Sequence, residues 1–333
     1  MTSTRRMATL LGLATAAAVV LSGCAAADTG TTADDGTSSV VASTNVYGQI
    51  AQEIGGDLIE VTSIVTSGAQ DPHSFEPSAR DQLTVATADL IIENGGGYDA
   101  FIDALIESSG SEAHVLTAVE YSHDWRENTG HEADGDAGHD DETESAAEDH
   151  EHGDHEHVQG FNEHVWYDPH TIAHLAEDIA AELGELSPAD AATFTANADA
   201  FAAEIDGLES SLAEIEAAHA GAQIFATEPV PFYLAEAAGL EDATPSAFSE
   251  AVEEGQDVAP ATLLEALTLI ESGDIAVMIT NAQTGGAETT AVLDAAAAQD
   301  IPVVEFTETL PEDQTYISWM QANIEALSGA LSE

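Results

Sequence analysis

Seven apolar residues recur at intervals of three or four in the middle of this 333-residue chain, and this repeat constrains the fold most. The spacing predicts one helix with a single apolar stripe. Ser187 and Pro188 supply its start signals, so the predicted helix covers 187–219 and is about 45 Å long. An isolated coiled coil is the alternative, but such a stripe more often packs along a globular body. The seven residues are Phe194, Ala198, Phe201, Ile205, Leu208, Leu212 and Ile215.

Apolar strand-like segments alternate with helix-like segments on both sides of this helix. The alternation predicts an α/β fold with two lobes, an N-terminal lobe over 39–186 and a C-terminal lobe over 220–333, each with a parallel sheet. Ligands of such sheets bind beyond the carboxyl ends of the strands. The expected strands are 40–44, 58–65, 89–93, 114–116, 223–227, 243–248, 275–280 and 303–307, and the expected helices include 101–106, 260–270 and 289–298.

The charge of the chain is strongly one-sided. It has 63 acidic residues against four basic ones, a formal net charge of −59, and no lysine. Nucleic acids and anionic lipid surfaces would repel it, so we expect no nucleic-acid partner. The acid excess resembles that of proteins adapted to high salt, where screening makes self-repulsion tolerable. We interpret most of this charge as a solvation feature and not as a site.

The N-terminus has the pattern of an export signal. Arg5 and Arg6 precede a short apolar run that ends in LSGC, which resembles a bacterial lipobox. This predicts a lipoprotein signal peptide over 1–23, a lipidated Cys24 and a flexible tether over 24–38. The mature protein would then be exported and lipid-anchored to the outer face of the cytoplasmic membrane. Whether export uses the Sec or the twin-arginine route stays open.

Seven of the thirteen histidines lie in one acidic loop, 121–160. Imidazole suits zinc, copper, nickel and iron, and carboxylate extends the range toward manganese. The pattern therefore predicts a weak, metal-collecting loop; the alternative is an acidic, solvated loop with incidental histidines. The histidines are His123, His131, His139, His150, His152, His155 and His157.

Four further residues with metal-binding side chains stand at or beyond expected strand ends. His73 lies in a loop after a strand, His164 follows the acidic loop, and Glu228 and Glu308 each follow a strand. Taken singly, each has an ordinary structural explanation: a turn for the histidines, a helix N-terminus for Glu228 and surface charge for Glu308.

Several motifs together resemble a known family. The string DPHSFEP at 71–77, NGGG at 94–97, EHVW at 163–166 and the central helix are similar to the metal-receptor lipoproteins of bacterial zinc and manganese ABC importers. The resemblance covers about residues 40–331. It implies two Rossmann-like lobes with parallel sheets, joined by one long rigid helix, with a single metal site between them.

The resemblance also implies a ligand set. His73 and His164 match the family's first two ligands. Glu228 matches the third, which is often histidine in zinc receptors and glutamate in manganese receptors. Glu308 falls at the fourth, usually aspartate, and Asn281 is a fallback contributor.

The implied function is a monomeric receptor that captures zinc, or alternatively manganese, and delivers it to an ABC permease and its ATPase. A surface adhesin or a metal-storage protein is an alternative. A metallohydrolase is the least favoured, because four protein ligands would leave no position for water and the chain has no nucleophile motif. The chain is therefore expected not to be an enzyme.

Overall fold

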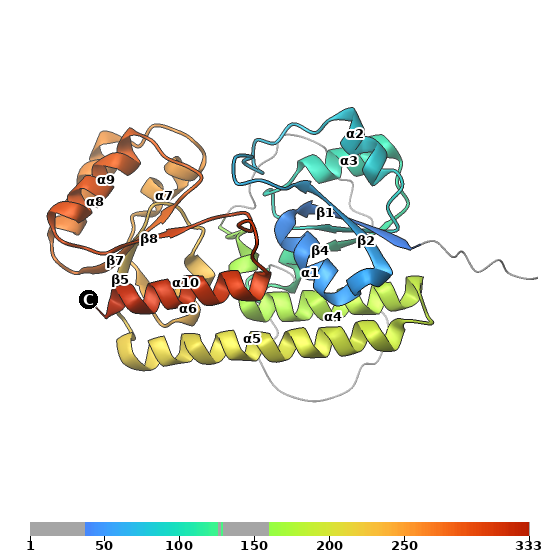
Figure 1. Ribbon diagram of the computed structural model, residues 1–333. Helices are drawn as coiled ribbons and strands as arrows, with labels where there is room; N and C mark the ends of the chain where they lie inside the picture. The colour runs from blue at the N-terminus through green and yellow to red at the C-terminus, as the bar shows by residue number, and fades with distance from the viewer. Residues whose placement is uncertain (1–36, 126–127, 129–159, 333) are drawn as a thin grey trace, which may run out of the picture. The chain divides into compact units, whose positions relative to one another are not determined.

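The computed structural model describes residues 37–125, 128 and 160–332 (Figure 1). The predicted signal peptide, Cys24, nearly all of the tether and six of the seven loop histidines lie outside the described residues, so these predictions remain predictions. None of the helices in the described ranges has the length and apolarity needed to cross a membrane.

The first sheet has four parallel strands in the order β2-β1-β3-β4. Neighbouring residues of its central strand enter different cores: Val40 and Ala42 pack on one face, and Val41 packs on the other. A strand buried on both faces is apolar throughout, which is why it could be predicted from sequence. The strands are β1 (Ser38–Thr44), β2 (Ile59–Val65), β3 (Leu90–Glu93) and β4 (His114–Thr117).

Helices cover both faces of this sheet. α1 (Asn45–Gly55) packs into the core on the Val40 face, whereas α2 (Ala79–Val85) and α3 (Phe101–Ser109) pack on the Val41 face. α2 begins at a reciprocal capping box between Ser78 and Asp81.

The second sheet repeats the same arrangement with parallel strands in the order β6-β5-β7-β8. Its strands are β5 (Gln223–Ala226), β6 (Glu241–Asp242), β7 (Ile275–Asn281) and β8 (Val303–Phe306). The helices of this part are α6 (Phe232–Ala237), α7 (Ser246–Glu253), α8 (Pro260–Glu271), α9 (Ala287–Ala298) and α10 (Tyr316–Leu331). The two sheets confirm the predicted α/β fold class.

The strand predicted over 243–248 is wrong. β6 ends at Asp242, and the chain turns into helix α7 from Ser246. Pro245 explains the change, because its ring removes a ladder donor and suits a helix start. The apolar residue of this segment, Phe248, is buried on one side of a helix and not on one face of a strand.

The long helix α5 (Ala191–His219) confirms the predicted stripe, since all seven of its apolar residues are buried. It has 29 residues and is therefore about 43 Å long. It begins four residues later than expected, because Ser187 closes a preceding helix, α4 (Pro169–Leu186), which was not predicted.

α5 contributes to a core that both sheets share. This core contains Val40 and Ile92 of the first sheet and Ile224 and Ile279 of the second. α5 contacts α1 and α4 as well as α6 and α10 (Figure 1). The described residues form one compact unit, so the lobe limits drawn from sequence stay predictions.

A buried acid at the end of β3 predicts a pH-dependent stability. Burial, with Asp99 and Asp103 nearby, raises the pKa of Glu93 to about 8 from its ordinary 4.5. The folded state thus holds this proton more tightly than the unfolded state does. The contribution of Glu93 to the free energy of unfolding is therefore complete below pH 4.5 and is lost as pH rises through 8.

Between pH 5 and pH 9, we therefore expect the free energy of unfolding to fall in wild type by on the order of 3 kcal/mol more than in Glu93→Gln. The amide can still accept the hydrogen bond that Thr117 Oγ1 donates at 2.8 Å. Urea unfolding with chelator at both pH values measures the effect. Exposed Glu112→Gln is the control, and equal pH slopes for wild type and Glu93→Gln would refute the assignment.

Candidate metal centre

The predicted site residues stand beyond the carboxyl ends of the strands, where parallel sheets present their loops. His73 lies in the loop between β2 and α2, and His164 precedes a short 3-10 turn at Val165–Tyr167. Glu228 follows β5 by two residues, and Glu308 follows β8 by two.

His73 is held by its own loop. Its backbone N–H donates to Asp71 Oδ1 at 2.9 Å, and Ser74 Oγ donates to the other oxygen of Asp71 at 2.7 Å. The imidazole stands edge-on to Tyr98 with ring centroids 4.8 Å apart, and its side chain is 17% exposed. The DPHS turn therefore positions a ring that is partly exposed but whose two nitrogen atoms are buried.

His164 is fully buried, and Asn162 sets its orientation. Asn162 Nδ2 donates to Pro229 O at 2.9 Å, which turns Asn162 Oδ1 toward His164. This oxygen lies 2.7 Å from His164 Nδ1, so Nδ1 carries the proton and donates. The lone pair of Nε2 is consequently directed to the opposite side, as in a histidine that binds a metal.

Asn162→Ala is therefore expected to lower metal affinity by about 10–100-fold, because the ring loses its fixed tautomer. Competition titration with a zinc chelator measures this. The matched control is Asn128→Ala, since the contacts of Asn128 Nδ2 with described residues are to the carbonyls of Glu120 and Ser122. Unchanged affinity in Asn162→Ala would show that the tautomer is not set by this contact.

Asn281 lies between the two predicted carboxylate ligands. Its Nδ2 donates to Glu228 Oε2 at 2.7 Å and to Glu308 Oε1 at 2.6 Å. Its own oxygen accepts from the backbone N–H of Gln283 at 3.0 Å. Asn281 therefore turns its nitrogen toward the acids and positions them in this structure. Thr284 Oγ1 donates to the remaining oxygen of Glu228.

The loop that carries Glu308 is anchored on both sides. Gln283 Oε1 accepts from the Glu308 N–H at 2.6 Å, and Asn45 forms two hydrogen bonds with the backbone of Leu310, at 2.8 and 3.0 Å. Since Asn45 begins α1, this loop is tied to the first sheet as well as to the second.

The structure brings three of the four predicted ligands together. One ligand atom from each of His73, His164 and Glu308 lies within 4.8 Å of the others. His73 Nε2 is 3.8 Å from Glu308 Oε2, and the two imidazole centroids are 6.1 Å apart. Glu228 is not in this group of described residues, although Asn281 links it to Glu308.

His123, the one described histidine of the acidic loop, belongs to a separate exposed group. It lies with Asp124 and Glu236, and its Nδ1 is 3.7 Å from Asp168 Oδ2. It is 59% exposed, whereas the residues of the central group are largely or fully buried.

One acid at the centre was not predicted from the sequence. Glu253, the last residue of α7, places Oε1 at 3.5 Å from His164 Nε2. It also forms a candidate metal group with His73 and Glu163. A helix starting after Pro245 would have included this acid, but residues 243–248 were predicted as a strand and no element was predicted at Glu253.

Within the described ranges, the acids at this centre are not paired with an arginine or a lysine. Burial raises the pKa of Glu308 to about 8, and the charge of Glu228 raises it further. Burial also raises the pKa of Glu253 to about 9 and raises that of Glu228. Arg80 is the only arginine or lysine in the described residues, and none of their ion pairs joins it to these acids. A divalent cation would supply the missing positive charge.

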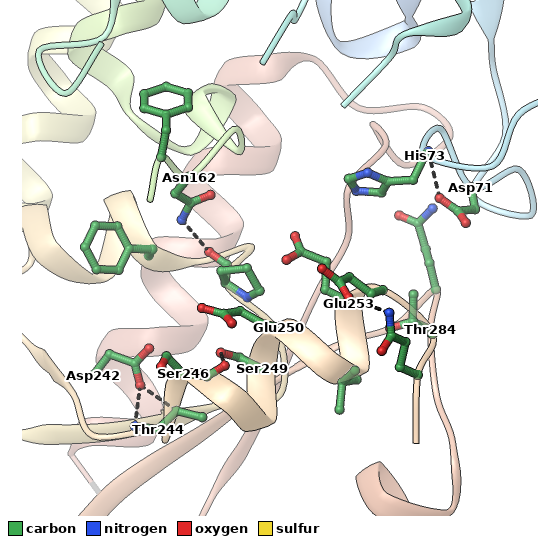
Figure 2. A pocket seen from close by; sticks show the side chains of 18 of the residues that line it. Asp71, His73, Asn162, Asp242, Thr244, Ser246, Ser249, Glu250, Glu253 and Thr284 are labelled. Atoms are coloured by element: carbon green, nitrogen blue, oxygen red, sulfur yellow. Dashed lines mark hydrogen bonds between the residues drawn. The ribbon is translucent and has the colours of Figure 1, made fainter. Parts of the chain in front are cut away.

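An open cavity of about 1700 Å³ leads to the centre. Its lining includes Asp71, His73, Glu250, Glu253 and Thr284, and in Figure 2 His73 and Glu253 extend toward one another across it. The cavity reaches the edge of the His73 ring, whose two nitrogen atoms are buried, and His164 is inaccessible to solvent.

Known proteins are similar to most of this chain. The manganese-binding lipoprotein MntA of Halalkalibacterium halodurans is 28% identical over 192 residues, which are 58% of this chain and 54% of that protein. The zinc-binding lipoprotein AdcA of Streptococcus pneumoniae is 26% identical over 301 residues, or 88% of this chain and 56% of that protein. The chain thus spans about half the length of these curated relatives.

The fold also occurs in solved structures. A mutant laminin-binding adhesin (Lmb) from Streptococcus agalactiae superposes with a TM-score of 0.67 at 22% identity, covering 89% of this chain and 100% of that one. At this identity the likeness shows the fold alone. A family model described as "Zinc-uptake complex component A periplasmic" matches residues 40–330. Because this match covers far more than half of its length, the chain belongs to that ZnuA family, whose members are solute-binding proteins and not enzymes.

Proposed function

We propose that this protein is an extracytoplasmic receptor that captures one divalent transition metal, zinc in preference to manganese, and delivers it to an ABC importer. The observation that carries the proposal is the convergence of His73, His164 and Glu308 within 4.8 Å in a largely buried centre. Its relatives MntA and AdcA are a manganese-binding and a zinc-binding lipoprotein, which supports the metal class and leaves the choice of ion open.

The proposed ligands are His73, His164, Glu228 and Glu308. Two neutral imidazoles and two carboxylates balance the charge of a divalent ion, so binding removes the repulsion between buried acids. Glu228 would move toward the other three when the ion arrives, with Asn281 as the link. The first two ligands come from loops of the first sheet and the last two from the second, so the ion ties both parts together. We expect only modest movement on binding, because α5 packs along both parts.

Zinc is favoured on chemical grounds. Affinities of nitrogen and oxygen sites follow the Irving–Williams order, in which zinc exceeds manganese. The histidines of loop 121–160 point in the same direction, because imidazole suits zinc. Glu228, at a position where histidine is frequent in zinc receptors, is the argument for manganese.

The loop histidines would raise the local metal concentration near the cavity and pass weakly held ions to the centre. The anchor would be a lipid on Cys24, which matches the description of both curated relatives as lipoproteins. The loaded monomer would dock on a permease with its ATPase, and it would contact the membrane only through the lipid. Adhesion and metal storage remain alternatives for a protein on the cell surface.

Metal analysis of protein purified without chelator, followed by competition titration, tests this function. We expect one tight zinc site per chain plus weaker sites, and loss of the tight site in His73→Ala. Deletion of 129–159 is expected to remove the weak sites and leave the tight affinity nearly unchanged. Several equivalent sites would favour storage, and an unchanged tight site in His73→Ala would overturn the proposed centre.

A further inference from the structure

Helix α7 supplies a carboxylate that the four proposed ligands do not include. Glu253 is 11% exposed, and its Oε1 lies 3.5 Å from His164 Nε2. With His73 and Glu163 it forms a group whose ligand atoms all lie within 4.8 Å of one another. Glu253 therefore reaches both imidazoles of the centre from an element that carries none of the other ligands.

The contact between Glu253 and His164 is not an ordinary hydrogen bond. Its length of 3.5 Å exceeds the usual range for a nitrogen donor and a carboxylate oxygen. The proton of His164 already resides on Nδ1, where it is donated to Asn162. Nε2 therefore presents a lone pair to a carboxyl oxygen, and a metal ion between the two atoms would be held by both.

A second acid supports the same interpretation independently. Glu308 Oε2 is buried and faces His73 Nε2 at 3.8 Å. Glu253 Oε1 is likewise buried. Two buried carboxylate oxygens thus face the imidazoles from different elements, Glu308 from the loop after β8 and Glu253 from α7.

We propose that Glu253 is a further metal ligand, supplied by α7, which adds an oxygen to the shell formed by His73, His164, Glu228 and Glu308. The inference rests on the proposed function. It concerns how many ligands the protein offers, and therefore which ions the centre accepts.

The additional oxygen matters differently for the two candidate metals. Zinc is satisfied by four ligands in a tetrahedron, and a fifth adds little. Manganese prefers six-coordinate shells rich in oxygen, so it gains from each extra carboxylate. Glu253 is thus expected to raise manganese affinity more than zinc affinity and to reduce the preference for zinc.

The end of α7 offers a matched control. Glu254 follows Glu253 directly and is exposed, and its side chain is in none of the candidate metal groups among the described residues. Glu253→Gln and Glu254→Gln make the same replacement at adjacent positions. Any difference between them therefore reports contact with the ion and not the general electrostatic field.

Competition titrations of wild type and both variants with Mn²⁺ alone and Zn²⁺ alone test the proposal. In Glu253→Gln we expect manganese affinity to fall by at least about tenfold and zinc affinity by less than about threefold. In Glu254→Gln both should stay near the wild-type values. Unchanged manganese affinity in Glu253→Gln, an equal loss in Glu254→Gln, or equal losses for both metals would each overturn the proposal.

The visible spectrum of the Co²⁺-loaded protein tests the ligand role directly, because it would not change if Glu253 had a purely structural role. Wild type should show the weak absorption of five-coordinate cobalt, and Glu253→Gln the stronger bands of a four-coordinate ion. Identical spectra would overturn the proposal. Glu253→Ala serves as the second variant if the amide disturbs folding.

Failure of this inference differs from failure of the proposed function. If His73→Ala abolishes one-to-one binding while Glu253→Gln matches wild type, only the role of Glu253 is wrong. If wild type itself binds no ion at one-to-one stoichiometry, the proposed receptor function fails instead.

Discussion

Replacing His164 with alanine is expected to lower zinc affinity by more than about 100-fold, because it removes a ligand and not merely a residue that orients one. The ring is fully buried, and Asn162 holds its tautomer with Nε2 facing the centre. A titration against a high-affinity zinc chelator at pH 7.5 measures the change. His174→Ala is the control, since His174 is 49% exposed on α4.

The variant must be shown to fold, because the ring of His164 also packs against Tyr98 and Trp166. Urea unfolding in the presence of chelator compares the metal-free proteins. A metal-free His164→Ala as stable as wild type but without tight zinc binding supports a ligand role. Tight zinc binding that survives in a folded His164→Ala would contradict the site.

Truncating Phe201 to alanine is expected to lower the free energy of unfolding by about 3–5 kcal/mol. The ring is only 2% exposed on the apolar stripe of α5, and its centroid lies 5.9 Å from that of Tyr316 on α10. The substitution leaves a cavity where the long helix meets the C-terminal helix, and the surrounding backbone cannot close it fully.

Urea unfolding of the metal-free protein measures this loss. Glu204→Ala on the exposed side of the same helix is the matched control, with an expected change within about 0.5 kcal/mol. A loss below about 1 kcal/mol in Phe201→Ala would mean that the stripe does not support the shared core. The zinc affinity of the folded fraction should remain unchanged, because Phe201 contributes no atom to the centre.

Much of the fold could be predicted because burial leaves a periodic trace in the sequence. Strands such as β1, which are covered on both faces, are apolar throughout, and the stripe of α5 repeats every three or four residues. The errors arose where two signals competed. Ser187 and Pro188 mark a connection between two helices, so the start of α5 was placed too early, and Pro245 was overlooked inside a segment predicted as a strand.

Some residues of the candidate centre could likewise be inferred from the sequence, and others could not. His73 and His164 stand in motifs whose local turns orient them, so their importance could be inferred from the sequence. Glu253 carries no such motif, because it is one of many glutamates in an acidic chain. Its proximity to His164 arises only when α7 packs across the cavity.

The sequence by itself determined the α/β class, the long helix and the candidate ligands His73, His164, Glu228 and Glu308, because these depend on local periodicity and on motifs. Only the tertiary structure decided that His73, His164 and Glu308 meet, that Asn281 joins Glu228 to Glu308, and that Glu253 faces them. The reason is physical: a metal centre is set by distances between residues far apart in the chain, and those distances depend on how helices and sheets pack around a common core.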